Sequence, residues 1–388
     1  MNPSSKGWLK EYLSYYLTSI ESDNKEQFSE DSIYKMISSS SLLFSIPIKQ
    51  SESLHPDFQK WNLKEKIKII FAEHLFRISD AYIKTHKFAL KTSDVYERFS
   101  ELSEEENSTE LFINKILIGK KDTLLLNAYN INPWAFLYLI EFYYFLKTET
   151  FDRQKIKLNI IKGMFKAAKA NDDISKKEAR LLKRVIENGD FTKSEKESIY
   201  KYSEVKITET NFTQTKTLIK KITYDFALLA LMTDKTIDEA ELIFVNQYAD
   251  LLDISLKEQY QTFSIIQDIH LNHYQQIPHL HKSYSVKSMQ SVVSHNFKYV
   301  LKKNLSMIVN EISESKELVQ LLRKSTDKRL SNEEKAKVKE QILDLLKTIP
   351  SLTIFMIPGG SILLPILMKI LPEELIFPSS FINKNKDS

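Results

Sequence analysis

Two acidic turns in the middle of the chain contain the residues best suited to bind a cation. Asp172 and Glu178 belong to the first turn, and Asp234 and Glu241 belong to the second. Several converging carboxylates are what a hard cation needs. The same side chains also suit helix capping and complement the helix dipole without any ion. Because the full spacing of a calcium-binding loop is absent, we favour capping and keep a metal site at these four residues as the alternative.

Helix-capping patterns follow both turns. Ser175 and Glu178 have the spacing of a capping box, in which each residue's side chain accepts a hydrogen bond from the other's backbone N–H. Asp238 has the matching position in the second turn. We therefore expect one compact unit of two similar halves, with capped helices over 175–188 and 238–252.

Four histidines, His270, His273, His279 and His281, form a second candidate metal site. Imidazoles that share a helix face beside a carboxylate are typical ligands of transition metals. The first two can share such a face, but Pro278 separates them from the other pair and indicates a helix end. We expect a polar interhelical loop here and no tightly bound metal.

Common catalytic motifs are missing from the sequence. It contains no cysteine, no Gly-rich phosphate loop, no nucleophile elbow and no HExxH motif. The 55 basic and 51 acidic side chains leave a net charge of only +4, which is too even a mixture for a nucleic-acid-binding stripe. We therefore expect a non-enzymatic protein without a cofactor and without direct nucleic-acid contact.

Helix is the expected secondary structure along almost the whole chain. Only six glycines occur in 388 residues, and apolar residues recur every three to four positions. The first third predicts helices near 5–21, 62–86 and 133–148, with His74 as a core residue on the buried face of the second helix. The sequence thus predicts an all-α fold, and its length favours more than one packed unit.

The C-terminal region starts with an amphipathic helix and continues into an apolar segment that prolines interrupt. Ser331 and Glu334 have capping-box spacing, and Val338 opens an apolar stripe in the helix that follows. Residues 352–371 contain thirteen apolar residues and one charge, over about the length that crosses a bilayer. Five of the ten prolines lie at 350–378, so two short arms are favoured over one rod. The residues predicted to associate with the membrane are Pro350, Phe355, Pro358, Gly359, Gly360, Leu363, Leu364, Pro365, Lys369 and Pro372.

Two placements of this apolar segment stay open on physical grounds. It suits a hairpin inserted into the membrane or its interface, and it equally suits a hydrophobic hairpin buried between soluble helices. Basic residues favour the upstream side as cytoplasmic; they are Lys335, Lys337, Lys339 and Lys347 upstream, against Lys384 and Lys386 downstream. We expect the protein at the cytoplasmic face of the inner membrane, with the cytoplasm as the alternative.

The middle of the chain resembles the TerB-like domain of the tellurite-resistance family. In that domain each of two helical halves has an alanine-rich helix, an acidic turn and a capped helix. The residues that carry the resemblance are Ala167, Ala168, Ala170, Asp172, Ile174 and Glu178, then Ala227, Ala230, Asp234, Ile237 and Glu241.

The last part of the chain resembles the opening of the Letm family domain, which is known from mitochondrial inner-membrane proteins. The resemblance implies ribosome binding or cation exchange at a membrane, and its combination with a TerB-like middle resembles a bacterial group labelled Letm-related biofilm-associated proteins. The matching residues are Glu334, Asp344, Leu346, Lys347, Pro350, Pro358, Leu363, Leu364, Pro365, Lys369, Pro372, Pro378, Ser379 and Phe381.

Three functions follow from these patterns. The leading hypothesis is a membrane-associated helical adaptor whose partners are membrane lipid and another membrane protein or the ribosome. The alternatives are a component of cation or proton exchange, for which Lys369 is the one charged candidate in the apolar run, and a soluble binding protein with a buried C-terminal hairpin. The predicted segments are an N-terminal helical domain at 1–150, a TerB-like domain at 151–260, connecting helices at 261–329 and a Letm-like segment at 330–388.

Overall fold

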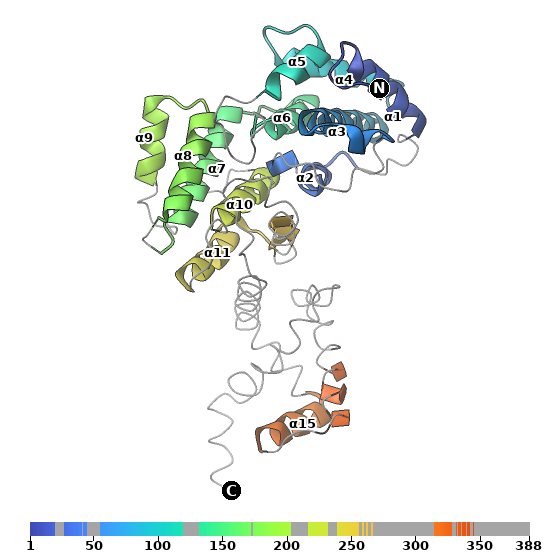
Figure 1. Ribbon diagram of the computed structural model, residues 1–388. Helices are drawn as coiled ribbons and strands as arrows, with labels where there is room; N and C mark the ends of the chain where they lie inside the picture. The colour runs from blue at the N-terminus through green and yellow to red at the C-terminus, as the bar shows by residue number, and fades with distance from the viewer. Residues whose placement is uncertain are drawn as a thin grey trace. The chain divides into compact units, whose positions relative to one another are not determined.

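Helices are the only regular elements among the residues described by the computed structural model, which confirms the predicted all-α fold (Figure 1). The described residues are 1–19, 27–40, 42–44, 55–118, 132–171, 174–202, 216–231, 239–255, 258, 259, 261, 262, 265, 266, 314–327, 331, 333, 334, 336–338, 340, 341 and 344. The α-helices are α1 (Trp8–Ser19), α2 (Glu30–Ser39), α3 (Leu63–His86), α4 (Thr92–Tyr96), α5 (Thr109–Ile116), α6 (Phe136–Leu146), α7 (Arg153–Ala168), α8 (Lys176–Asn188), α9 (Lys193–Tyr202), α10 (Thr217–Leu231), α11 (Glu239–Leu252) and α15 (Lys316–Asp327). Short 3₁₀ helices are η2 (Leu42–Phe44), η4 (Phe58–Lys60) and η5 (Glu97–Leu102).

Packing divides the chain into two compact units. Unit 1 comprises Met1–Ile254 and Gln261–Tyr284, and unit 2 comprises Ser255–Tyr260 and Ser285–Ser388. The helices from α1 to α11 therefore belong to unit 1, while α15 belongs to unit 2. The four segments expected from the sequence stay predictions.

The three helices expected in the first third are present as α1, α3 and α6. The start of α3 is fixed by a capping box, because the Asn62 side chain accepts the Glu65 N–H at 3.1 Å and the Glu65 carboxylate accepts the Asn62 N–H at 2.9 Å. The helix ends where Lys87 adopts a left-handed conformation with φ 54°. His74 is buried, as predicted, and burial lowers its pKa to about 3.

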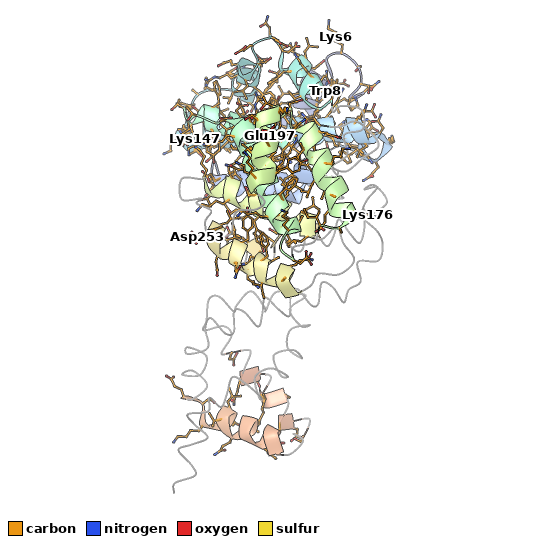
Figure 2. All side chains as sticks on the ribbon, turned by 90° about the vertical axis from the view of Figure 1, so that its left-hand side faces the viewer. Lys6, Trp8, Lys147, Lys176, Glu197 and Asp253 are labelled. Atoms are coloured by element: carbon orange, nitrogen blue, oxygen red, sulfur yellow. The ribbon has the colours of Figure 1, made fainter. Side chains whose placement is uncertain are left out.

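Tyrosines of α1 bind buried carboxylates of α3. The Tyr12 hydroxyl donates to Glu73 Oε2 at 3.0 Å, and the Tyr16 hydroxyl donates to Asp80 Oδ2 at 2.6 Å. Glu73 also accepts a hydrogen bond from Arg77 Nε at 2.7 Å. Burial raises the pKa of both tyrosines, so both hydroxyls keep their protons and remain donors. Trp8, the first residue of α1, is labelled in Figure 2 and is 1% exposed, so this helix pair combines polar contacts with apolar burial.

The helices of the middle region pack closely in unit 1. The helices expected over 175–188 and 238–252 are present as α8 and α11. The most extensive helix contact is that of α7 with α10, and a glycine allows it. A Cβ atom at Gly163 would lie 2.5 Å from Tyr248 Oη and 3.0 Å from Thr223 Cγ2, so no larger residue fits without a shift of the neighbours. Both predicted helices are therefore present, while the separate unit of two similar halves and the TerB-like assignment stay predictions.

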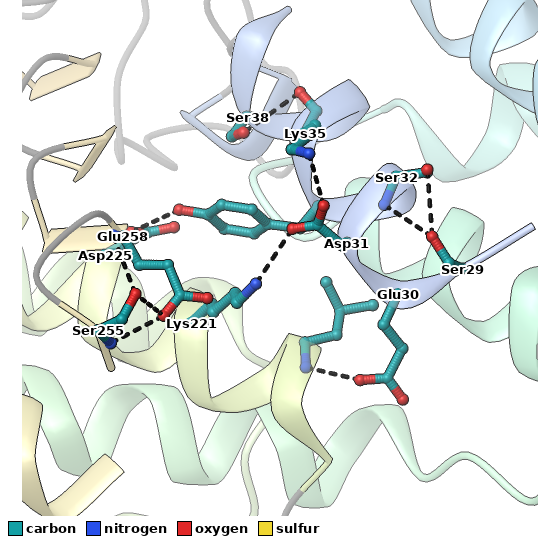
Figure 3. A network of polar contacts seen from close by, with 12 residues as sticks. Ser29, Glu30, Asp31, Ser32, Lys35, Ser38, Lys221, Asp225, Ser255 and Glu258 are labelled. Atoms are coloured by element: carbon teal, nitrogen blue, oxygen red, sulfur yellow. Dashed lines mark hydrogen bonds and ion pairs between the residues drawn. The ribbon is translucent and has the colours of Figure 1, made fainter. Parts of the chain in front are cut away.

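Helix α2 is joined to α10 by a series of polar contacts, part of which is labelled in Figure 3. The Asp225 carboxylate is 2% exposed, and its Oδ1 accepts the Thr262 hydroxyl at 2.5 Å. The contacts between the two helices are Glu30 Oε2 with Leu218 N at 2.9 Å, Asp31 Oδ1 with Lys221 Nζ at 3.3 Å, and Tyr34 Oη with Asp225 Oδ1 at 3.1 Å. Residues almost two hundred positions apart in the sequence are thus held together within unit 1.

Candidate functional site

Several predicted site residues lie outside the described part of the chain. These include all ten residues predicted to associate with the membrane and the four histidines between 270 and 281. Within the residues that the structure does describe, no helix combines the length and apolar character needed to cross a bilayer. Membrane association and the expected histidine loop therefore stay predictions.

Half of the candidate cation site is described. Asp172 and Asp234 lie outside the described residues, whereas Glu178 and Glu241 are buried, with 2% and 4% of their surface exposed. The capping box of α8 is confirmed, since Glu178 Oε2 accepts the Ser175 N–H at 2.9 Å and Ser175 Oγ accepts the Glu178 N–H at 3.2 Å. Across the described ranges, no three His, Asp or Glu side chains are grouped as metal ligands would be. Cation binding at the two turns stays the untested alternative.

A cavity of about 340 Å³ in unit 1 lies over the buried carboxylate of Asp80. Leu17, Leu90 and Thr92 also line it. Asp80 Oδ2 accepts the Tyr16 hydroxyl, and Asp80 Oδ1 accepts the Thr92 hydroxyl at 2.5 Å. Both carboxylate oxygens therefore take part in helix packing, and the carboxylate acts here as a structural acceptor.

In unit 2 the described residues between 314 and 344 form a helical hairpin, which is the candidate functional site. Its first helix is α15, and its second helix follows Ser331. The second helix has the predicted capping box, because Glu334 Oε2 accepts the Ser331 N–H at 2.9 Å and Ser331 Oγ accepts the Glu334 N–H at 3.2 Å. We call α15 and the described residues from Ser331 to Asp344 the C-terminal hairpin.

The two helices of the C-terminal hairpin run antiparallel. Side chains late in α15 meet the start of the second helix, and side chains early in α15 meet residues further along it. The contacts are Lys324 Nζ with Glu334 Oε1 at 2.5 Å, Glu317 Oε1 with Lys337 Nζ at 3.2 Å, Glu317 Oε2 with Gln341 Nε2 at 2.7 Å, and Ser315 Oγ with Gln341 Oε1 at 3.2 Å. This order of pairing requires opposite chain directions.

Apolar side chains lie between the polar contacts of the hairpin. Leu318 of α15 is 1% exposed, and Val338 of the second helix is 0% exposed. Val338 was expected on the buried stripe of its helix, so that part of the prediction is confirmed. The residues further along the stripe lie outside the described part of the chain. The hairpin is thus an amphipathic pair with a buried apolar side and an exposed polar rim.

Charges on the rim of the hairpin are largely matched. The hydrogen bond from Lys337 lowers the pKa of the Glu317 carboxyl, and the hydrogen bond from Lys324 lowers that of Glu334. Both carboxyls are therefore ionised at neutral pH and paired with ammonium groups. A rim of paired opposite charges suits docking to a protein surface better than neutralising a phosphate backbone.

Helix α15 is the part of this site that sequence reasoning missed. It lies in the range 261–329, for which only connecting helices were expected. A signal was present at Ser315, whose Oγ caps the helix by accepting the Leu318 N–H at 3.3 Å. The apolar residues that follow the cap also repeat at helical spacing; they are Leu318, Val319, Leu321 and Leu322.

Comparison with known protein families identifies the segment that the second helix of the hairpin opens. The model of the family described as LETM1-like, RBD, a ribosome-binding domain, matches residues 330–388. No curated protein and no solved structure matches the chain. The match begins one residue before Ser331 and leaves α15 and the whole of unit 1 outside it. The C-terminal part of this chain is therefore similar to the LETM1-like ribosome-binding domain.

Proposed function

We propose that the protein is a non-enzymatic helical adaptor of the Letm-related type, which binds the ribosome through residues 330–388 and is held at a membrane by its apolar C-terminal segment. The family match over 330–388 is the observation that carries the proposal. Its second support is the hairpin at the start of this segment, which has a buried apolar side and an exposed polar rim. Such a surface suits binding to a large partner.

The membrane part of the proposal rests on composition. Thirteen apolar residues lie within 352–371, and burial of each large apolar side chain in lipid contributes about 1.5–3 kcal/mol before losses. The prolines of this segment favour a hairpin or interfacial arrangement. The lysines upstream of it favour the cytoplasmic side, where ribosomes are also found.

The non-enzymatic part of the proposal agrees with the packing of unit 1. Its buried carboxylates Glu73, Asp80 and Asp225 each accept hydrogen bonds from hydroxyl groups. Carboxylates used in this way stabilise helix contacts. We infer that unit 1 is a scaffold or a second binding module.

Co-sedimentation with purified ribosomes tests the ribosome part. The full chain should pellet with ribosomes through a sucrose cushion, and a chain that lacks 330–388 should stay in the supernatant. Circular dichroism and gel filtration of the shortened chain are the controls for an intact helical body, and each protein is also spun without ribosomes. Equal pelleting of the two chains, or no pelleting of the full chain, would contradict ribosome binding through this segment.

Flotation with lipid vesicles tests the membrane part. The full chain should float with vesicles that contain anionic lipid, and a chain that lacks 350–388 but keeps the C-terminal hairpin should not. A full chain that is soluble and monomeric without detergent, together with a shortened chain that aggregates, would show that the segment is a buried hairpin. The membrane part of the proposal would then be wrong.

A further inference from the structure

We propose that α15 and residues 330–388 act together in binding the ribosome, as one binding unit. Within it, Glu317 positions the start of the segment 330–388. This role of α15 rests on the proposed ribosome binding and adds a helix that the family match leaves out. Three features of the C-terminal hairpin support it: a buried apolar residue on each helix, the pair of contacts made by Glu317, and the orientation of Gln341.

The second helix of the hairpin needs a partner to bury its apolar side. Val338 is 0% exposed, and Leu318 is 1% exposed on α15. Isolated helices shorter than about 12–15 residues are marginal in water, and most helices are stabilised by packing of an amphipathic face. The matched segment therefore starts on a helix that α15 helps to order.

Glu317 fixes the position of the second helix along α15. Its two carboxylate oxygens have different partners, since Oε1 binds Lys337 Nζ at 3.2 Å and Oε2 binds Gln341 Nε2 at 2.7 Å. Lys337 and Gln341 are four residues apart, so they are neighbours on one face of the second helix. One carboxylate thus spans a full turn of its partner helix, and a slide or a rotation would break at least one contact.

The amide group of Gln341 is held from both ends. Its Nε2 donates to Glu317, and its Oε1 accepts the Ser315 hydroxyl at 3.2 Å. Ser315 also caps α15 by accepting the Leu318 N–H. The cap of one helix is therefore connected to the register of the other, and substitutions in α15 should alter ribosome binding without touching 330–388.

Charge reversal in the full chain tests the positioning role. Glu317→Lys faces Lys337 with a like charge, and amide hydrogen exchange across 334–341 should accelerate about threefold, with ribosome affinity reduced by a similar factor. The double variant Glu317→Lys with Lys337→Glu restores the opposite charges and should recover most of both losses. Glu314→Lys makes the same charge change at an exposed position with no ion-pair partner among the described residues, and it should leave both measurements unchanged.

A second variant shortens the buried apolar side chain of Leu318 in α15. Leu318→Ala should accelerate exchange in the second helix by about thirtyfold or more, because a buried leucine is lost. Ribosome binding should fall with it. Faster exchange together with unchanged ribosome binding would show that α15 orders the hairpin without belonging to the binding unit, and would overturn the proposal.

The remaining outcomes separate this proposal from the proposed function. Unchanged exchange in Glu317→Lys would overturn the positioning role. Exchange that stays fast in the double variant would show that the opposite charges at 317 and 337 do not set the position of the helix, which also overturns it. A wild-type chain that does not sediment with ribosomes would refute the proposed function and the shared binding unit, while the exchange measurements would still decide whether Glu317 positions the second helix.

Discussion

The pairing of α2 with α10 in unit 1 and the C-terminal hairpin of unit 2 use similar polar side chains in different surroundings. In unit 1 the Asp225 carboxylate is 2% exposed and accepts the hydroxyls of Tyr34 and Thr262. In the hairpin the side chains of Glu317 and Lys337 are 54% and 62% exposed. Water competes for the groups of an exposed ion pair but not for a buried acceptor. The two kinds of contact therefore differ in how much they contribute to the free energy of unfolding.

Buried hydrogen bonds such as those of Asp225 hold two helices together stably. Loss of Asp225 leaves hydroxyl donors inside the protein, which is costly. Exposed pairs of the second kind contribute little free energy but select one arrangement of two helices. Exposed ion pairs of this kind suit a segment that binds a partner, because their polar groups stay hydrated and accessible.

The largest expected effect is that of Asp225→Ala in unit 1. The substitution removes the acceptor of Tyr34 and Thr262, and it should lower the free energy of unfolding by about 2–5 kcal/mol. Denaturant titration followed by circular dichroism measures this change. Tyr34→Phe, which removes one donor and leaves the carboxylate in place, is the matched control and should cost about 1 kcal/mol. A loss in Asp225→Ala of no more than about 1 kcal/mol, the size expected of an exposed pair, would break the distinction between buried and exposed contacts.

Gly163→Ala tests the close approach of α7, α10 and α11. The added methyl group would meet Tyr248 Oη at 2.5 Å and Thr223 Cγ2 at 3.0 Å, so the free energy of unfolding should fall by about 1–3 kcal/mol. Thermal denaturation measures the loss. Because Tyr248→Phe removes the atom nearest to the new methyl group, the double variant should be less destabilised than the sum of the two single changes. A fully stable Gly163→Ala would show that these helices separate easily.

The pH dependence of unit 1 should include a contribution from Glu141. Burial raises the pKa of this carboxyl to about 7, although the Arg153 guanidinium lies 3.0 Å away. The unfolded value is about 4.3, so the folded state binds the proton more tightly and the free energy of unfolding falls as pH rises from about 4.5 to about 7. Glu141→Gln should reduce this fall by about 1–2 kcal/mol, after allowance for solvent screening. Parallel stability curves for the two proteins would contradict the raised pKa.

The smallest effect is expected at the rim of the hairpin. Lys324→Gln removes the partner of Glu334, and amide exchange in the second helix should accelerate by no more than about twofold, because Lys324 is 47% exposed and Glu334 is only partly buried. In 1 M salt the wild type and the variant should converge further, since salt screens exposed charges. A change as large as that of a buried contact would show that the hairpin rim is stabilising rather than only orienting.

Local signals in the sequence predicted much of the fold. The capping boxes at Ser175 and Ser331, the helix around His74 and the place of Val338 on the apolar stripe of its helix all depend on residues within a few positions of one another. Spacing alone reports such contacts, because they repeat the geometry of a single helix.

Contacts between distant residues could not be predicted in this way. No sequence pattern singled out Asp225, although its carboxylate joins Tyr34 to Thr262. The pairing of Glu317 and α15 with the second helix was missed for the same reason, because the partners lie in another helix. A single sequence shows which residues can cap or pack, but the pairing of helices depends on tertiary contacts that no short spacing reports.

Site-specific crosslinking to the ribosome tests the central claim most directly. A photoreactive residue is placed in the full chain at Glu333, which is exposed on the second helix of the hairpin, or at Tyr200, which is 53% exposed on α9 of unit 1. Illumination of the ribosome-bound protein should give abundant crosslinks to ribosomal components from position 333 and few from position 200. Crosslinks from position 200 with none from position 333 would contradict ribosome binding through the LETM1-like segment.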